Sequence, residues 1–268
     1  MRIGLTANPR IPGTADLCTR ILKKIGTAHE VLLEQEIAKT LGNPGHRLRD
    51  MKVDLILAVG GDGTILRAFQ LNDAEVLGIN SGSLGFLAEI YGAEVDAYLA
   101  RVLQGDYRTQ ERMRLRVEVN GQRLPDCLNE AVVHTAQISK IREFEIRVDG
   151  QVAEKVRADG VILATPTGST SYAMSAGGPI VDPRVDAIIV ATIAPFKPSA
   201  RPIVFPPTSW VEVKLAKPKE CLLVLDGQQE VPLQGPEDIR VTRSERPARF
   251  IRFRDDFYQR IEQKLAKP

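Results

Sequence analysis

Cysteine and histidine are scarce in this sequence, which limits the disulfide and metal chemistry it can support. The cysteines have no C-x-x-C spacing, and their odd number leaves at least one thiol unpaired. This pattern favours a reducing compartment, so we expect a cytoplasmic protein. The histidines are unclustered and no H-E-x-x-H motif occurs, so no protein ligand is assigned to a metal. The three cysteines are Cys18, Cys127 and Cys221.

Long apolar runs and an excess of one charge are also missing. The longest nearly uncharged apolar stretch, Ala187 to Phe196, contains a proline and is far shorter than the roughly 20 residues of a membrane span. The apolar run at the N-terminus is too short for a signal peptide. Lys and Arg number 36 against 34 Asp and Glu, which is too balanced for a protein that binds the nucleic-acid backbone. We expect neither membrane nor nucleic acid as a partner.

The first hundred residues alternate short apolar runs with helical periodicity. The clearest strand, Val53 to Val59, is aliphatic and β-branched and stops at Gly60-Gly61. Strands that alternate with helices predict a parallel sheet with helices on its faces. We assign residues 1–106 to this α/β domain. Its other expected elements are strands at 3–7, 31–33 and 76–79 and helices at 17–25 and 95–103.

The pattern changes after Tyr107 to apolar and polar residues in alternation. Three of these runs end at the turn sequences Asn120-Gly121, Asp149-Gly150 and Asp226-Gly227, which are strong hairpin signals. We therefore assign 107–254 to a β-rich, antiparallel C-terminal domain. Phe257, Ile261 and Leu265 form one stripe of a final helix at 255–265, which is a candidate to pack back on the first domain. The expected strands lie at 115–119, 144–148, 210–215 and 221–225.

A glycine-rich turn, Gly60-Gly61-Asp62-Gly63-Thr64, follows the clearest strand. Ligands bind at the carboxyl ends of strands in open α/β sheets, and glycines let the backbone approach a ligand closely. The free N–H groups of the following helix favour an anion such as phosphate. Asp62 repels phosphate unless a metal or a transferable proton intervenes, which suggests a base or a metal holder. The alternative is a strand-ending turn in which Asp62 caps the helix.

Two further loops are rich in small or hydroxyl side chains. The loop Asn80 to Phe86 contains small residues followed by one aromatic ring. It is interpreted either as a nucleobase site or as a turn in which Phe86 fills the core. Thr165 to Gly178 carries seven hydroxyl side chains and three glycines, which suits a sugar and an amide better than a metal. Asn129-Glu130 follows an apolar pair and is a candidate for ribose hydroxyls. Either of the last two segments can also be an ordinary solvated loop.

Several common motifs are missing. There is no G-x-x-x-x-G-K-[ST], which excludes a P-loop enzyme, and no G-x-G-x-x-G after a strand, which leaves ordinary Rossmann binding unsupported. Ser169 lacks the G-x-S-x-G frame of a hydrolase.

Taken together, Gly60–Thr64, Asn129-Glu130 and Asp159–Pro179 resemble the NAD kinase family in order and separation. The resemblance runs from the first strand to Gln228, and the Thr165–Pro179 stretch is its most specific part. It implies an α/β domain followed by a β-rich domain, and a homodimer or homotetramer. It also implies transfer of a phosphoryl group from ATP or polyphosphate to the 2′-hydroxyl of the adenosine ribose of NAD, giving NADP, with a divalent metal, Mg²⁺, as cofactor.

The resemblance also assigns roles to individual residues. Asp62 matches the aspartate that contacts the adenosine ribose and acts as base, and Gly63 lies against the same dinucleotide. Arg67 matches a basic position near the new 2′-phosphate, and Asn129 with Glu130 match the ribose-binding pair. The phosphate turn comprises Gly60, Gly61 and Thr64. The remaining nucleotide-binding candidates are Phe86, Arg157, Asp159, Thr167, Thr170, Ser171, Tyr172, Ala173, Met174, Ser175, Ala194 and Gln228.

The sequence departs from the family pattern at three places, which bear on substrate preference. Ser171 replaces a more usual Ala, Ala200 replaces a Leu or Ser, and His134-Thr135 lacks a basic residue often found there. Three rival functions are considered. The first is a kinase with the same glycine-rich turn that acts on another substrate, a lipid or a sugar. The others are a non-catalytic NADP-binding module and an NADP phosphatase. The phosphoryl donor, the choice of NAD or NADH and feedback by NADP stay open.

Overall fold

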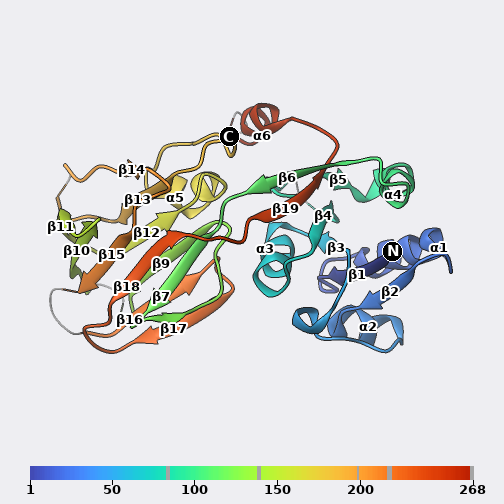
Figure 1. Ribbon diagram of the computed structural model, residues 1–268, viewed down its shortest axis with the longest axis horizontal. Coiled ribbons are helices and arrows are strands. Elements are labelled where there is room, and N and C mark those ends of the chain that lie inside the picture. Colours follow the sequence, from blue (N-terminus) through green and yellow to red (C-terminus); the bar gives the residue numbers. More distant parts are fainter. Residues whose placement is uncertain (83–84, 138–139, 198, 216–218, 266–268) are drawn as a thin grey trace. The chain divides into compact units, whose positions relative to one another are not determined.

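The computed structural model describes residues 1–82, 85–137, 140–197, 199–215 and 219–265 (Figure 1). The chain divides into two compact units. One contains Met1–Glu111 together with Ala248–Pro268, and the other contains Arg112–Pro247. Ser83 and Leu84 of the expected Asn80–Phe86 loop lie outside the described residues.

The first unit is built on one sheet with the strand order β2-β1-β3-β4-β19-β6, and β5 also pairs with β4. The pairs β1–β2, β1–β3, β3–β4, β4–β5 and β4–β19 are all parallel, which confirms the predicted parallel sheet. The strands are β1 (Arg2–Ala7), β2 (Glu30–Leu33), β3 (Leu55–Gly60), β4 (Glu75–Asn80), β5 (Ile90–Tyr91), β6 (Arg108–Arg112) and β19 (Ala248–Arg252).

Helices cover both faces of this sheet. Leu55 and Leu57 of β3 share a buried cluster with residues of α1 and α4, because alternate strand residues point to one face. On the other face, Phe69 of α3 packs its ring 4.5 Å from that of Phe250 in β19. The helices are α1 (Thr14–Ile25), α2 (Gln35–Leu41), α3 (Asp62–Leu71), α4 (Val95–Leu103) and α6 (Phe257–Leu265), with short 3₁₀ turns at Leu48–Asp50 and Gly92–Glu94.

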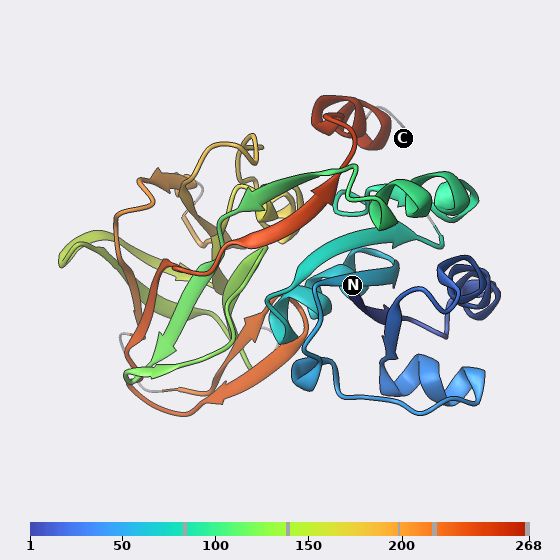
Figure 2. The same ribbon diagram turned by 45° about the vertical axis from the view of Figure 1, so that its right-hand side comes forward.

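Strand β19 joins the first sheet although it follows the β-rich segment in the sequence. Phe250 of β19 is in register with Val76 of β4, and β6 lies on the other side of β19. Figure 2 shows the red β19 strand running alongside the green β6 strand. The residues of β19 fall within the 107–254 segment that the sequence analysis assigned to the second domain. After β19 the chain continues directly into α6.

The second unit is a sandwich of two antiparallel sheets. One has the order β11-β10-β15-β18-β7-β8 and the other β14-β13-β12-β9-β16-β17. Val117 and Phe144 from the first sheet share one buried cluster with Val133 and Leu223 from the second. The predicted β-rich antiparallel domain is confirmed. Its elements are β7 (Leu115–Val119), β8 (Gln122–Arg123), β9 (Glu130–Thr135), β10 (Arg142–Val148), β11 (Gln151–Ala158), β12 (Gly160–Ala164), a 3₁₀ turn (Gly168–Thr170), α5 (Tyr172–Ser175), β13 (Ile188–Ile193), β14 (Ile203–Phe205), β15 (Val211–Leu215), β16 (Cys221–Leu225), β17 (Gln229–Leu233) and β18 (Ile239–Arg243).

The three predicted hairpin turns form where the sequence places them. Asn120, Asp149 and Asp226 each have φ of 50° and each precedes a glycine that also has positive φ. Asn and Asp tolerate this left-handed conformation better than other residues with a side chain, and glycine adopts it freely. Local turn chemistry therefore fixes these strand ends. Within the described residues, no helix combines the length and apolar character that a membrane crossing requires.

Candidate active site

The glycine-rich turn joins the central strand β3 to helix α3 in the first unit. Gly60 is the last residue of β3, Gly61 is the N-cap residue of α3, and Asp62 to Thr64 form its first turn. No side chain hydrogen-bonds to the N-cap end of this helix. Its first N–H groups and the positive end of the helix dipole are therefore available to an anion.

Asp62 does not cap the helix, so that alternative is wrong. Its carboxylate instead accepts hydrogen bonds from the backbone N–H groups of Phe86, at 2.8 Å, and Leu87, at 3.0 Å. Gly85 lies so close that a Cβ atom there would be 2.0 Å from Asp62 Oδ1. The segment after β4 thus fixes the orientation of the Asp62 side chain, and a side chain at position 85 would displace the Asp62 carboxylate.

The side chain of Arg67, which lies in α3, pairs with a buried carboxylate at the carboxyl end of β2. Both of its Nη atoms donate to Glu34, with Nη1 at 2.9 Å from Oε2. Glu34 is 3% exposed and also accepts a hydrogen bond from the Thr6 hydroxyl at 2.5 Å. The hydrogen bond from Arg67 therefore compensates the burial of the Glu34 charge, and it raises the pKa of the guanidinium.

Phe86 is half-buried and does not fill the hydrophobic core. The Nζ atom of Lys264 in α6 lies 4.2 Å from the centroid of its ring, which is a cation–π distance. The core-filling alternative for this loop is therefore wrong, and the nucleobase site stays a prediction.

A second set of candidate residues gathers at one end of a sheet in the second unit. Strand β9 lies between β12 and β16 and is antiparallel to both, with Glu130 opposite Ala164 and Ala131 opposite Leu225. The start of β9 therefore lies beside the ends of β12 and β16. This topology brings together Asn129-Glu130, the Thr165–Ser175 loop and the Asp226 turn.

Asp226 organises this end of the sheet. Its carboxylate accepts three backbone N–H groups, from Leu128 at 2.7 Å, Asn129 at 2.8 Å and Glu130 at 2.9 Å. Burial raises the pKa of Asp226 to about 6, while the three hydrogen bonds act in the opposite direction. The sequence analysis treated Asp226 only as a hairpin residue, and an Asp-Gly turn gives no signal of this contact.

Glu130 and Asn129 each keep a buried oxygen without a protein partner. Ser171 donates its hydroxyl to Glu130 Oε1 at 3.1 Å, but Glu130 Oε2 and Asn129 Oδ1 have no hydrogen bond within the described residues. Burial, followed by the nearby Asp226 charge, raises the pKa of Glu130 to about 8. Unsatisfied buried oxygens are uncommon, and two adjacent ones are what a ligand with hydroxyl groups needs.

Part of the hydroxyl-rich loop stabilises its own conformation. The Thr165 hydroxyl donates to the Leu128 carbonyl at 2.6 Å, and the Ser169 hydroxyl donates to the Pro166 carbonyl at 2.7 Å. A Cβ atom on Gly168 would lie 2.2 Å from the Asn129 carbonyl oxygen, so this glycine allows close packing. Thr165 and Ser169 are fully buried and hold the loop against Asn129.

The other candidates in the second unit differ in exposure. Thr167 and Ala173 are buried, whereas Thr170, Ser171 and Met174 are half-buried and Tyr172 and Ser175 are exposed. Arg157 is exposed, with its guanidinium 5.0 Å from the Phe196 ring, and Asp159 is half-buried between β11 and β12. Ala194 and Gln228 are exposed, and Ala194 has a φ of 45°, which is strained for a residue with a side chain.

No preformed metal centre is visible in the part of the chain that the structure describes. It contains no group of three or more His, Cys, Asp or Glu side chains that could hold an ion. Cys18, Cys127 and Cys221 are buried free thiols.

Comparisons with known proteins agree over both units. Residues 8–107 match the family model for the ATP-NAD kinase N-terminal domain, and residues 128–253 match that for the C-terminal domain. A curated NAD kinase of Thermoplasma acidophilum is 40% identical over 268 residues, covering 100% of this chain and 98% of its own. One of Methanothermobacter thermautotrophicus is 41% identical over 276 residues, covering 100% and 97%.

Two solved structures share the fold. An NAD kinase from Archaeoglobus fulgidus in complex with ATP has a TM-score of 0.80 and 29% identity, and the match covers 99% of each chain. A yeast NADH kinase complexed with NADH has a TM-score of 0.90 at 24% identity, and the match covers 100% of this chain and 88% of that one.

Proposed function

The chain belongs to the NAD kinase family, and on this premise we propose that it transfers a phosphoryl group to the 2′-hydroxyl of the adenosine ribose of NAD, giving NADP. The observation that carries this proposal is the pair of buried oxygens, Glu130 Oε2 and Asn129 Oδ1, that lack a protein partner. Ribose hydroxyls are donors of the right kind to satisfy them.

The ribose is held, in this proposal, by the Asn129-Glu130 pair. Asp226 keeps the backbone of the pair in place through three N–H contacts, so the two side chains keep their orientation before the ligand arrives. Glu130 forms a hydrogen bond with one ribose hydroxyl through Oε2 while Ser171 occupies Oε1. Such preorganisation lowers the entropy that binding must offset.

Asp62 acts as the base for the 2′-hydroxyl. A carboxylate has about four lone-pair positions, and the N–H groups of Phe86 and Leu87 occupy one on each oxygen. The remaining positions can align the hydroxyl and accept its proton as the new phosphate ester bond forms and the phosphoanhydride bond to the rest of the donor breaks. The two N–H contacts also keep the carboxylate from rotating away.

The phosphoryl donor is placed by the glycine-rich turn. Gly60, Gly61 and Gly63 carry no side chains that would keep phosphate away, and the uncapped N-terminus of α3 offers N–H groups and a positive dipole. Phosphoryl transfer depends mainly on such positioning and on charge neutralisation. ATP is the donor we expect, since the similar Archaeoglobus fulgidus enzyme was solved in complex with ATP; polyphosphate is the alternative.

Magnesium would arrive with the donor. Mg²⁺ in nucleotide sites is usually bound by substrate phosphates and at most one or two carboxylates, which is compatible with a described chain that has no group of three acidic or imidazole ligands. When bound, Mg²⁺ would neutralise charge on the phosphates. We also propose a homodimer or homotetramer, and a cytoplasmic location consistent with three buried free thiols.

The test is a turnover assay with purified protein, Mg²⁺, NAD and either ATP or polyphosphate, read with an NADP-specific dehydrogenase. NADP formation with one donor supports the proposal and identifies that donor. No turnover with either donor, in a folded sample that binds NADP, would favour a non-catalytic binding module. Parallel reactions with a sugar or a diacylglycerol as acceptor test the rival kinases, and release of phosphate from NADP tests the phosphatase.

A further inference from the structure

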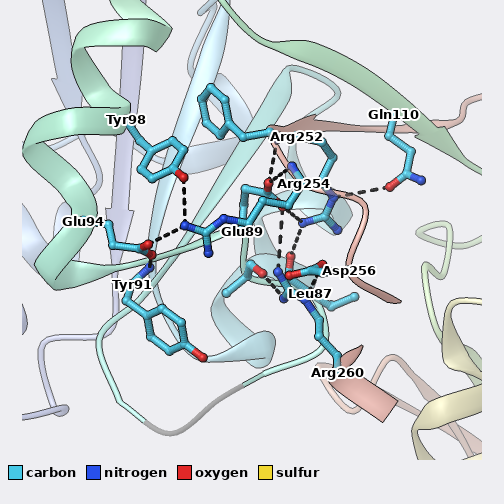
Figure 3. Close-up of polar contacts among 12 residues, drawn as sticks. Leu87, Glu89, Tyr91, Glu94, Tyr98, Gln110, Arg252, Arg254, Asp256 and Arg260 are labelled. Carbon is cyan, nitrogen blue, oxygen red and sulfur yellow. Dashed lines mark hydrogen bonds and ion pairs between the residues drawn. The ribbon is translucent and has the colours of Figure 1, made fainter. Parts of the chain in front are cut away.

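The segment Phe86–Glu89 connects Asp62 to a distant part of the first unit. Its first two residues donate their N–H groups to the Asp62 carboxylate. Its last residues contact Arg252–Lys264, which we call the C-terminal arm and which comprises the end of β19 and nearly all of α6. Figure 3 shows the polar contacts around Glu89, Arg252 and Arg260.

Arginines of the arm bind backbone carbonyls of this segment. Arg252 Nη1 donates to the carbonyl of Leu87 at 3.0 Å, and Arg260 Nη1 donates to the carbonyl of Ala88. Leu87 therefore accepts from the arm through its carbonyl and donates to Asp62 through its N–H. Few covalent bonds separate the two contacts, so a shift of the arm moves the groups that hold Asp62.

A buried carboxylate locks the same region to the arm. Glu89 is 2% exposed, and its Oε1 accepts the backbone N–H groups of Phe253, at 2.6 Å, and Arg254, at 2.9 Å. Its Oε2 lies 2.9 Å from Arg252 Nη1 and 3.9 Å from Arg260 Nη2. Buried charges held in this way have little freedom to move, because every displacement leaves a charge or a polar group unpaired.

Arg260 is the member of the cluster that α6 contributes. It is 7% exposed, the only residue of the described helix α6 that is buried, and its Nε donates to Asp256 at 2.8 Å. Arg252, by contrast, also contacts Gln110 and Phe250 and belongs to the sheet itself. Substitution of Arg260 therefore perturbs the Phe86–Glu89 segment with less direct effect on the strands.

We propose that Arg260 is a positioning residue for Asp62: it fixes the Phe86–Glu89 segment, whose N–H groups orient the Asp62 carboxylate. The inference rests on the proposed role of Asp62 as base. It gives the C-terminal helix a part in the chemical step without contact with a substrate. A displacement of about 1 Å at the reacting groups costs up to about 100-fold in rate, so the effect is measurable.

The test compares kcat and KM of the full chain with those of R260A, R260K and a control, R254A. Arg254 lies on the same arm, but its side chain donates to Glu94 and to Tyr98 Oη, away from the Phe86–Glu89 segment. For R260A we expect kcat about 10- to 100-fold lower with KM for NAD and ATP unchanged. R260K keeps the charge but not the forked donors, so its kcat should lie between those of the wild type and R260A. R254A should keep the wild-type kcat although it loses a similar amount of Tm to R260A.

A double-mutant cycle with Asp62 separates positioning from general stability. If Arg260 acts through Asp62, R260A lowers kcat in the wild-type background but has little further effect in D62N. Equal fractional losses in both backgrounds, an unchanged kcat in R260A, or equal losses in R260A and R254A would overturn the inference. If R260A does not fold, R260K carries the same comparison.

The proposed function fails in a different way from the positioning inference. It fails if the wild-type chain forms no NADP, whereas a D62N variant that keeps the wild-type kcat would reject the role of Asp62 as base. If the wild type forms NADP and D62N loses kcat as expected, an R260A variant with the wild-type kcat rejects the positioning role alone.

Discussion

Substitution of Glu130 by glutamine should change how thermal stability depends on pH. Burial and the nearby Asp226 raise the pKa of Glu130 to about 8 in the folded chain, whereas its ordinary value is 4.5. The folded state therefore binds this proton more tightly than the unfolded state does. The contribution of the group to stability is complete below pH 4.5 and is lost as the pH rises towards 8.

The expected size follows from this displacement. Between pH 6.5 and pH 9 the unfolded chain keeps Glu130 ionised while the folded chain must give up its proton, which costs about 2 kcal/mol at 1.36 kcal/mol per pH unit. Asp226, with a pKa raised only to about 6, titrates mostly below this range. A change of about 2 kcal/mol lowers Tm by about 4–8 °C in a chain of this size.

The assay is differential scanning fluorimetry of the wild-type chain and Glu130→Gln at pH 6.5 and pH 9. We expect Tm of the wild type to fall by about 4–8 °C more than that of the variant. Glu145→Gln is the control, because Lys155 and then Arg147 lower the pKa of that carboxyl, so it does not titrate in this range. Identical pH dependence in the wild type and Glu130→Gln would refute the account of Glu130.

Three further substitutions test contacts that position the site. Gly85→Ala places a methyl group against Asp62, so we expect kcat to fall about 10-fold or more with unchanged affinity for NAD in calorimetry; a normal kcat contradicts this. Asp226→Asn replaces one acceptor oxygen by an amide, so the Kd for NAD should rise about 10-fold, and an unchanged Kd rejects its positioning role. Arg67→Ala leaves Glu34 buried without its cation, which should cost about 3 kcal/mol in urea unfolding. The same substitution should also weaken the binding of NADP more than that of NAD, and equal losses of affinity for both ligands would refute a place for Arg67 near the 2′-phosphate.

Elements set by local patterns could be predicted from the sequence. The alternating runs and the Asn120-Gly121, Asp149-Gly150 and Asp226-Gly227 turns gave the hairpins, because both signals act over a few residues. The location of Asp62 after a parallel strand was likewise predictable, since the carboxyl ends of such strands are where ligands bind.

Contacts between distant segments could not be predicted in this way. Asp226 is an ordinary hairpin residue by sequence, and only the pairing of β16 with β9 brings it to the backbone of Asn129-Glu130. The place of β19 beside β4 has the same cause, since periodicity identifies a strand but not its neighbours.

The C-terminal helix shows the limit of an apolar stripe as a guide to burial. The stripe of Phe257, Ile261 and Leu265 predicted the helix, but Leu265 is 50% exposed and the buried residue is Arg260. A charged residue is buried here because Asp256, Glu89 and a backbone carbonyl compensate it. Asp256 lies at i−4, but Glu89 and the Ala88 carbonyl come from a distant segment that helical periodicity does not identify.

The most direct test of the central claim is a paired measurement of kcat and of NAD affinity for the wild-type chain and Asp62→Asn. If Asp62 is the base for the 2′-hydroxyl, the variant keeps its Kd for NAD, while kcat for NADP formation falls about 10²- to 10⁴-fold. A variant that forms NADP at the wild-type rate would contradict the account of this site.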